Sequence, residues 1–281
     1  MTPRTGRPYL DAVLPDGDAT DGAAVLAFAH RGGVHHPELG GRENTIAAFR
    51  HAWGLGYRYL ETDVHVSADG VLLAFHDDVL DRLTGSSGAV AAVRYEVIRD
   101  VLVGGLEPIP TLSALVDALP GARFNIDLKA DGAVRPLADL VVARGLEDRV
   151  LVGSFSHERL REFRRLTDGG VATSASPLEI AALRAAPRAR LVRRLARNFD
   201  AVQIPPARRG LAVLTRGLLA RAHALGKHVH VWTIDDAAEM ADLLDLGVDG
   251  LFTDRTDVLK DVLLARGQWA LPGLDETEDA G

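Results

Sequence analysis

The strongest constraint on this chain's fold is a regular alternation of short apolar runs with helical segments. Eight runs rich in β-branched residues are the predicted strands, at residues 25–29, 59–64, 123–128, 150–155, 172–175, 201–204, 228–234 and 250–253. Strict alternation predicts a parallel sheet with helices outside it, and eight repeats favour closure into a (βα)8, or TIM, barrel. An open doubly wound sheet is the alternative, but no glycine-rich nucleotide loop follows the first strand.

The helices are predicted between these strands, at residues 44–55, 112–119, 133–144, 156–166, 177–197, 214–225 and 237–246. Thr111 is a natural N-cap, and glycines such as Gly145, Gly226 and Gly247 follow several of the predicted helices as stop signals.

One segment breaks the alternation. The sequence "SADG" at residues 67–70 predicts a turn, and residues 71–75 read as a further short strand. We therefore expect a small hairpin-plus-loop insertion, about residues 65–110, after the second strand. The prediction is a single barrel domain over residues 23–266, with flexible termini at residues 1–22 and 267–281.

Composition excludes several classes of function. The chain has 281 residues, a net charge of −7 and no cysteine. The charge gives no general case for nucleic-acid binding, and the missing thiols exclude disulfides, thiolate metal sites and cysteine nucleophiles. No apolar run reaches the length of a membrane span or a signal-peptide core, so we expect a cytoplasmic protein, whose oligomeric state the sequence does not specify.

Polar residues gather at the predicted carboxyl ends of strands, where TIM barrels place their active sites. They are His30, Arg31, Glu61, Asp63, His76, Asp127 and Lys129. Because side chains alternate along a strand, Glu61 and Asp63 share one face, as do Asp127 and Lys129.

The three acids predict a cation site. Three carboxylates at one point cannot all stay ionised without a cation, and oxygen ligands favour Mg²⁺ or Ca²⁺. One alternative is that Glu61 and Asp63 are solvated or paired with arginines. Another is that His65, on the same face, completes a Glu-x-Asp-x-His site for a softer metal.

His30 and His76 end separate strands near this cation site, which suits a general acid and a general base at neutral pH. Arg31 and Lys129 add fixed positive charge of the kind that stabilises a phosphate in its transition state. Trp232 is expected to form an apolar wall of the pocket.

His228 and His230, on the same strand as Trp232, resemble the paired histidines of zinc amidohydrolases. The fourth strand lacks the further histidine that such a site needs, so we expect these two to pack inside the barrel.

Taken together, the motifs resemble the glycerophosphodiester phosphodiesterase family over about residues 26–259. The matching pieces are "AHRGG" (29–33), "ENTIAAF" (43–49), "ETDVHVSADGVLLAFHDDVLDRLTG" (61–85), "IPTL" (109–112), "NIDLK" (125–129), "GSF" (153–155), "VWTID" (231–235) and "GVDGLFTDR" (247–255). Each piece is weak alone, but their order and spacing are specific.

The resemblance implies a TIM barrel with catalytic histidines, metal-binding acids, basic substrate contacts and an aromatic wall. In that order, these are His30 and His76; Glu61, Asp63 and Asp127; Arg31 and Lys129; and Trp232. Two positions depart from the family pattern. Asp127 stands where Glu is usual, so the ion could bind through water or shift, and Arg42 stands where Pro is usual before Glu43, which is expected to border the site.

The activity implied is metal-dependent hydrolysis of small glycerophosphodiesters to an alcohol and sn-glycerol 3-phosphate, in lipid and glycerol metabolism. The nucleophile is either water or the neighbouring glycerol hydroxyl. One alternative is a lysophospholipase D on the same barrel, whose wide apolar entrance could come from residues 77–110. The other is a non-catalytic binding barrel, which would not need both histidines and all three acids.

Overall fold

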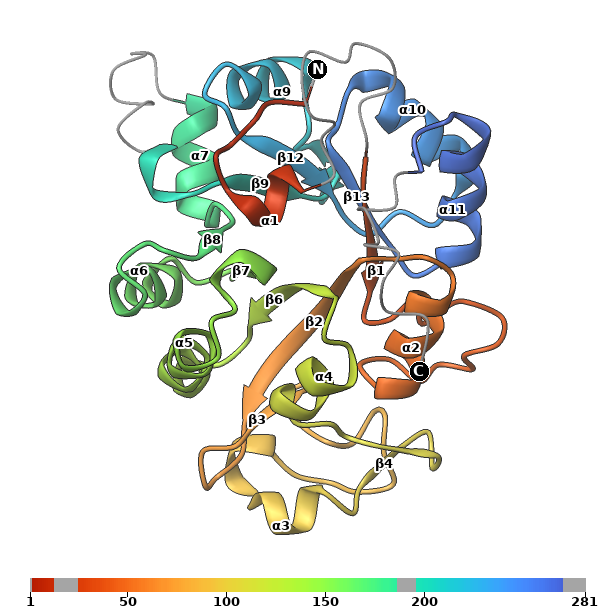
Figure 1. Ribbon diagram of the computed structural model, residues 1–281, viewed down its shortest axis with the longest axis vertical. Coiled ribbons are helices and arrows are strands. Elements are labelled where there is room, and N and C mark those ends of the chain that lie inside the picture. The colour runs from red at the N-terminus through yellow and green to blue at the C-terminus, as the bar shows by residue number, and fades with distance from the viewer. Residues whose placement is uncertain (1, 13–24, 186–195, 270–281) are drawn as a thin grey trace.

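Eight parallel strands form the frame of the protein (Figure 1). The computed structural model describes residues 2–12, 25–185 and 196–269. In sheet order the strands are β8 (Ala172–Thr173), β7 (Val150–Gly153), β6 (Arg123–Leu128), β2 (Tyr59–Val66), β1 (Leu26–His30), β13 (Gly250–Thr253), β12 (His228–Val231) and β9 (Ala201–Ile204). A parallel bridge between Ser174 and Ala201 joins the two edge strands, so the barrel is nearly closed. The predicted (βα)8 barrel is confirmed.

Helices surround the sheet, as the alternation predicts (Figure 1). They are α2 (Ile46–Gly54), α4 (Leu112–Ala118), α5 (Val134–Ala143), α6 (His157–Leu166), α7 (Pro177–Ala185), α9 (Arg216–His223), α10 (Ala237–Leu246) and α11 (Thr256–Ala265). The predicted N-cap Thr111 accepts a hydrogen bond from the amide of Ala114. α11 was not predicted, and part of the helix predicted at 177–197 lies outside the described residues.

Three predicted strands were too long. The predicted strand 150–155 ends at Gly153, 172–175 ends at Thr173, and 228–234 ends at Val231. In the first case, the Ser154 side chain turns back to donate a hydrogen bond to the Leu128 carbonyl, and Phe155 is exposed.

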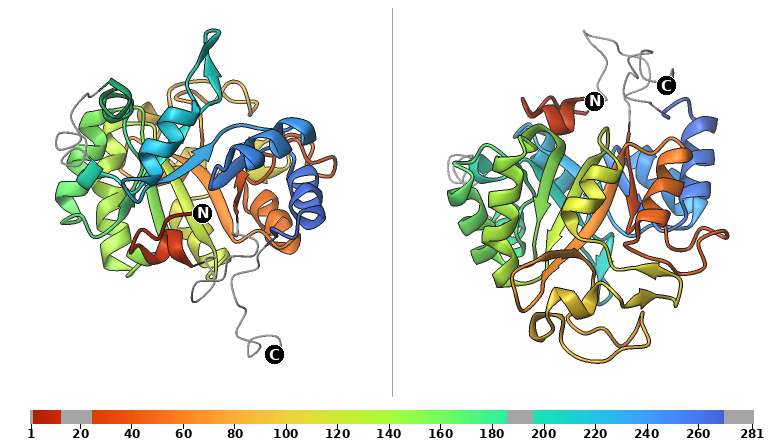
Figure 2. Two further views of the ribbon diagram at one scale, coloured as in Figure 1. Left: turned by 90° about the horizontal axis from the view of Figure 1, so that it is seen from above. Right: turned by 60° about the horizontal axis from the view of Figure 1, so that its bottom comes forward.

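The insertion after β2 is a compact unit rather than a loose loop. β3 (Leu72–Ala74) runs antiparallel to β2 and is followed by α3 (Tyr95–Ile98), β4 (Leu102–Val103) and β5 (Glu107–Pro108). Its buried apolar side chains form their own cluster, which consists of Leu73, Phe75, Leu80, Val90, Ile98, Val101, Val103 and Ile109. The insertion therefore has a small core of its own, and it lies at the end of the barrel opposite α1 (Pro8–Asp11) (Figure 2, right).

The opposite end of the barrel is covered by α1 (Pro8–Asp11) (Figure 2, right). Tyr9 and Leu10 are fully buried, and the Tyr9 ring packs edge-on against Tyr59 at 5.3 Å between centroids. The Pro, Gly and Asp content of residues 1–22 predicts a flexible terminus, but the apolar pair Tyr9 and Leu10 within it is buried. Residues 13–22 and 270–281 lie outside the described residues. In the described part of the chain, no helix combines the length and apolar character needed to cross a bilayer.

Candidate active site

A cavity of about 560 Å³ opens at the carboxyl ends of the barrel strands. All eight residues singled out from the sequence line it, namely His30, Arg31, Glu61, Asp63, His76, Asp127, Lys129 and Trp232. These side chains come from strands far apart in the chain, so the barrel brings them together as the sequence analysis expected.

The register between neighbouring strands determines which residues lie beside the acids. Asp63 on β2 lies opposite Asp127 on β6, and Glu61 lies opposite His30 on β1. The hairpin returns His76 to the same site, because Phe75 donates its backbone N–H to the carbonyl of Asp63 at 3.0 Å.

The contacts of His65 indicate a structural role and not the alternative role as a ligand for a softer metal. Its Nε2 lies 3.0 Å from the backbone carbonyl of His76. A carbonyl oxygen only accepts hydrogen bonds, so Nε2 carries the proton and donates it. His65 therefore fixes the end of the hairpin that carries His76.

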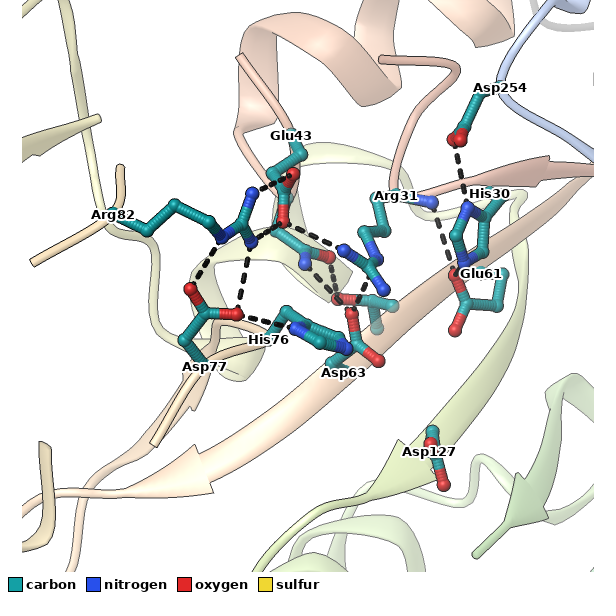
Figure 3. Close-up of polar contacts among 12 residues, drawn as sticks. His30, Arg31, Glu43, Glu61, Asp63, His76, Asp77, Arg82, Asp127 and Asp254 are labelled. Carbon is teal, nitrogen blue, oxygen red and sulfur yellow. Dashed lines mark hydrogen bonds and ion pairs between the residues drawn. The ribbon is translucent and has the colours of Figure 1, made fainter. Parts of the chain in front are cut away.

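The two candidate catalytic histidines are held in the same way (Figure 3). His30 Nδ1 lies 2.8 Å from Asp254 Oδ1, and His76 Nδ1 lies 2.6 Å from Asp77 Oδ1. Since an ionised carboxylate only accepts hydrogen bonds, each Nδ1 is the donor and each Nε2 is left free. Both imidazoles are thus oriented with one free nitrogen for proton transfer.

The charges around His30 favour its protonated form. Burial lowers the pKa of His30, but the Glu61 carboxylate and the hydrogen bond to Asp254 outweigh burial and raise it. The Nε2 atom lies 3.7 Å from Glu61 Oε2. For the other pair, the hydrogen bonds from Arg82 lower the pKa of Asp77 to about 2, so this carboxylate stays ionised beside His76.

Two basic side chains lie among the acids. Lys129 Nζ is 3.0 Å from Asp63 Oδ1 and 2.6 Å from Asp127 Oδ2, and Arg31 Nε is 3.2 Å from Asp63 Oδ2. Burial raises the pKa of Asp63, but Lys129 and Arg31 more than offset this and lower it. Burial and the neighbouring Asp63 together raise the pKa of Glu61. Three carboxyl groups therefore share the site with two basic side chains, and Glu61 is the one whose pKa is raised.

This donor set fits a hard divalent cation in its chemistry. Glu61 and Asp63 are almost fully buried, and all their candidate donor atoms are oxygens. However, the oxygens of Glu61, Asp63 and Asp127 do not all lie within 4.8 Å of one another in the described chain, because the Lys129 ammonium separates two of the acids. Two other groups meet that distance: His35, Asp235 and Asp254, and His36, Glu38 and His51.

An ion-pair chain connects the barrel to the insertion (Figure 3). Arg31 contacts the buried Glu43 at 3.0 Å, Glu43 accepts two hydrogen bonds from Arg82, and Arg82 donates two more to Asp77. Burial raises the pKa of Glu43, but the bonds from Arg82 and Arg31 lower it overall. The position of Arg31 is therefore coupled to that of the Asp77–His76 pair.

Sequence reasoning missed the roles of Asp254, Asp77 and Arg82. Asp254 directly follows β13, and Asp77 directly follows His76, so both positions carried a usable signal. Arg82 lies in the irregular insertion, where no strand or helix period indicates a direction. His228 and His230 are fully buried inside the barrel, and His230 packs on Phe28, which confirms that they are packing residues.

One part of the cavity is apolar. Its lining consists of Phe155, Pro177, Ile180, Ala181, Ile204, Pro205, Val213 and Trp232, with Arg184 and Arg208 beside them. The Trp232 ring meets Phe155 edge-on at 5.8 Å between centroids. This apolar wall comes from α7 and from the ends of β7, β9 and β12 and the segments after them, and the lining includes no residue of the insertion at residues 77–110.

Comparison with known proteins gives a consistent pattern. The model of the glycerophosphoryl diester phosphodiesterase family matches residues 30–258. A Mycobacterium tuberculosis protein named probable glycerophosphodiester phosphodiesterase 2 is 41% identical over 247 residues, 87% of this chain and 92% of that relative.

Solved structures share the fold. The Agrobacterium tumefaciens glycerophosphodiester phosphodiesterase superposes with a TM-score of 0.70 at 26% identity, covering 85% of this chain and 98% of its own. An Oleispira antarctica phosphodiesterase, solved with the product sn-glycerol-3-phosphate, gives a TM-score of 0.69 at 22% identity, covering 85% and 96%.

Proposed function

Because the chain belongs to the glycerophosphoryl diester phosphodiesterase family and is a phosphoric diester hydrolase, we propose that His30 and His76 are its proton-transfer pair. The reaction is hydrolysis of an sn-glycero-3-phosphoalcohol to an alcohol and sn-glycerol 3-phosphate. One observation carries the proposal: two imidazoles, each fixed through Nδ1 by a carboxylate, line one cavity together with three acids and two basic side chains.

The two histidines divide the proton transfers. One free Nε2 takes a proton from the attacking hydroxyl, and the other Nε2 gives a proton to the leaving alkoxide oxygen. Asp254 and Asp77 hold each ring in the required tautomer and stabilise its charged form. The attacking hydroxyl is that of water or the adjacent hydroxyl of the glycerol group, which would act through proximity and form a cyclic phosphate first.

Arg31 and Lys129 bind the phosphate. Both are partly buried and line the cavity beside the histidines, and their charges do not depend on pH near neutrality. A phosphodiester gains negative charge on its non-bridging oxygens during displacement. Two fixed positive charges therefore favour the transition state more than the bound substrate.

Glu61, Asp63 and Asp127 would hold a divalent cation, either Mg²⁺ or Ca²⁺. Such an ion supplies Lewis-acid polarisation of a phosphate oxygen when bound. In this chain the shorter Asp127 pairs closely with Lys129, so cation binding to that acid would free the Lys129 ammonium for the phosphate.

The test is an assay of glycerophosphocholine hydrolysis that measures release of sn-glycerol 3-phosphate with added Mg²⁺, added Ca²⁺ or a chelator. We expect one ion to support turnover and the chelator to abolish it. Asp127→Asn should weaken the response to the ion, whereas Asp131→Asn, an exposed acid outside the cavity, should not. Unchanged turnover in chelator would contradict the metal assignment, and no release of sn-glycerol 3-phosphate under any condition would contradict the proposed activity.

The apolar part of the cavity favours a second candidate, a lysophospholipase D that cleaves long-chain phosphodiesters. An acyl chain would find the wall of Phe155, Ile180 and Trp232 in place of solvent. Choline release from lysophosphatidylcholine, compared with that from glycerophosphocholine, separates the two. Faster turnover of the lysolipid, lost selectively in Ile180→Asp, would favour the second candidate.

A further inference from the structure

Exposed apolar and basic side chains border the apolar part of the cavity. We name this surface the hairpin rim and define it as Phe155, Leu178, Arg208, Arg209 and Leu211. Its three apolar members are 55%, 65% and 74% exposed in that order. Large apolar side chains this open to water, gathered at the mouth of an apolar cavity, indicate a contact surface.

A regular β-hairpin supports the hairpin rim. β10 (Ala207–Arg208) pairs antiparallel with β11 (Leu211–Ala212), and the turn between them, Arg209 and Gly210, has positive φ at both positions. Such a turn gives a tight two-residue hairpin. The hairpin stands out from the body of the barrel (Figure 2, left). Arg184 on α7 donates to the Ala212 carbonyl at 2.9 Å, so the hairpin is fastened to the cavity wall.

Four of its five members adjoin the cavity. Phe155 and Arg208 line it, Leu178 follows the lining residue Pro177, and Leu211 is the strand partner of Arg208. A molecule that leaves a surface in contact with the hairpin rim therefore enters the cavity beside its apolar residues.

The hairpin and the chain on either side of it carry only positive charge. The whole chain has a net charge of −7, yet residues 201–215 contain no Asp or Glu and carry two basic residues, Arg208 and Arg209. Arg208 and Arg209 have no carboxylate partner in the described ranges and lie beside exposed leucines. They fit a partner whose surface is negatively charged and whose interior is apolar.

We propose that the hairpin rim docks on the surface of a bilayer that contains anionic lipid. Leu178, Leu211 and Phe155 would enter the boundary between headgroups and acyl chains, while Arg208 and Arg209 would contact lipid phosphates. The bilayer then delivers a single-chain phosphodiester to the cavity. This step rests on the second candidate function, because a soluble glycerophosphodiester needs no such surface.

Flotation with vesicles tests the docking without any catalysis. We expect the full chain to bind vesicles of phosphatidylcholine with about one third phosphatidylglycerol, and to bind pure phosphatidylcholine vesicles more weakly. Leu211→Asp should weaken binding at least about tenfold through loss of a buried leucine, and Arg209→Ala about fivefold through loss of one basic contact. Leu264→Asp, which alters a similarly exposed leucine on α11, should bind like the unmodified protein.

Two results would overturn the proposal. One is failure of the unmodified chain to float with either vesicle. The other is equal binding by Leu211→Asp and Leu264→Asp, which would show that the hairpin makes no contact. Hydrolysis of soluble glycerophosphocholine, measured without vesicles, should be the same in Leu211→Asp as in the unmodified chain. That assay reports on the proposed function separately, so the two ideas can fail independently.

Discussion

The two histidines of the site have the same local arrangement on different supports. His30 ends a barrel strand, and its partner Asp254 directly follows the neighbouring strand. His76 follows the hairpin of the insertion, and its partner Asp77 is itself held by Arg82 from the same insertion. The His30 side chain is 15% exposed and the His76 side chain 31% exposed. One half of the proton-transfer pair is therefore built into the barrel frame, whereas the other is carried by a unit with its own small core.

This difference means that the barrel fixes the orientation of His30, whereas the insertion determines that of His76. The orientation of His30 depends on the same backbone hydrogen bonds that close the barrel. The orientation of His76 depends on β3, on the cluster beneath it and on an ion-pair chain that reaches Arg31. Changes in the insertion should therefore alter His76 and leave His30 in place.

Removal of either imidazole should cause the largest loss. We expect His30→Ala and His76→Ala each to lower kcat for glycerophosphocholine by about 10²–10⁴-fold, because each deletes one proton transfer. Circular dichroism checks the fold of each variant, and His51→Ala, outside the cavity, is the matched control. Near-full activity in either variant would remove that histidine from the mechanism.

Removal of the supporting carboxylates should distinguish the two supports. We expect Asp254→Asn to lower kcat by about 100-fold and Asp77→Asn by about tenfold, within the range seen when an orienting partner of a functional histidine is lost. The barrel site is the more closed of the two, so water replaces Asp254 less readily than Asp77. The measurement is kcat and KM for both variants under one set of conditions. Equal losses would show that the supports are equivalent.

Asp254→Asn should also change the pH at which His30 ionises. Glu61 and Asp254 raise the pKa of His30 against the lowering effect of burial, so His30 keeps its proton to a higher pH than an isolated histidine. Asp254→Asn removes part of the raising effect, and the ionisation of His30 should move to lower pH. NMR titration of the His30 ring proton measures this directly. A move to higher pH, or none, would contradict the assigned cause.

More of the barrel part of the site than of the insertion part could be predicted from the sequence. Period two and the strand ends place Glu61, Asp63 and Asp127 without a structure, because parallel strands end at one pole. The partnership of His30 with Asp254 spans 224 positions and exists only because β1 pairs with β13. That pairing follows from barrel closure, so it was predictable once closure was accepted. Arg82 was not, because the chain from residue 77 to residue 94 has no repeating pattern that indicates which side chain turns inward.

The smallest expected effect lies in the insertion's ion-pair chain. Arg82 is 48% exposed and donates two hydrogen bonds each to Asp77 and Glu43. We expect Arg82→Ala to lower kcat only about two- to fivefold, because half-exposed ion pairs contribute about 0.2–1 kcal/mol each.

Its control is Arg94→Ala, which removes an exposed arginine of the same insertion that pairs with Asp69 and Glu96, away from the cavity. Because Arg82 acts through Asp77 on His76, the loss in Arg82→Ala should largely disappear when Asp77→Asn is already present. Fully additive losses in the double variant would show that Arg82 acts elsewhere, and the insertion would then support His76 through its apolar core alone.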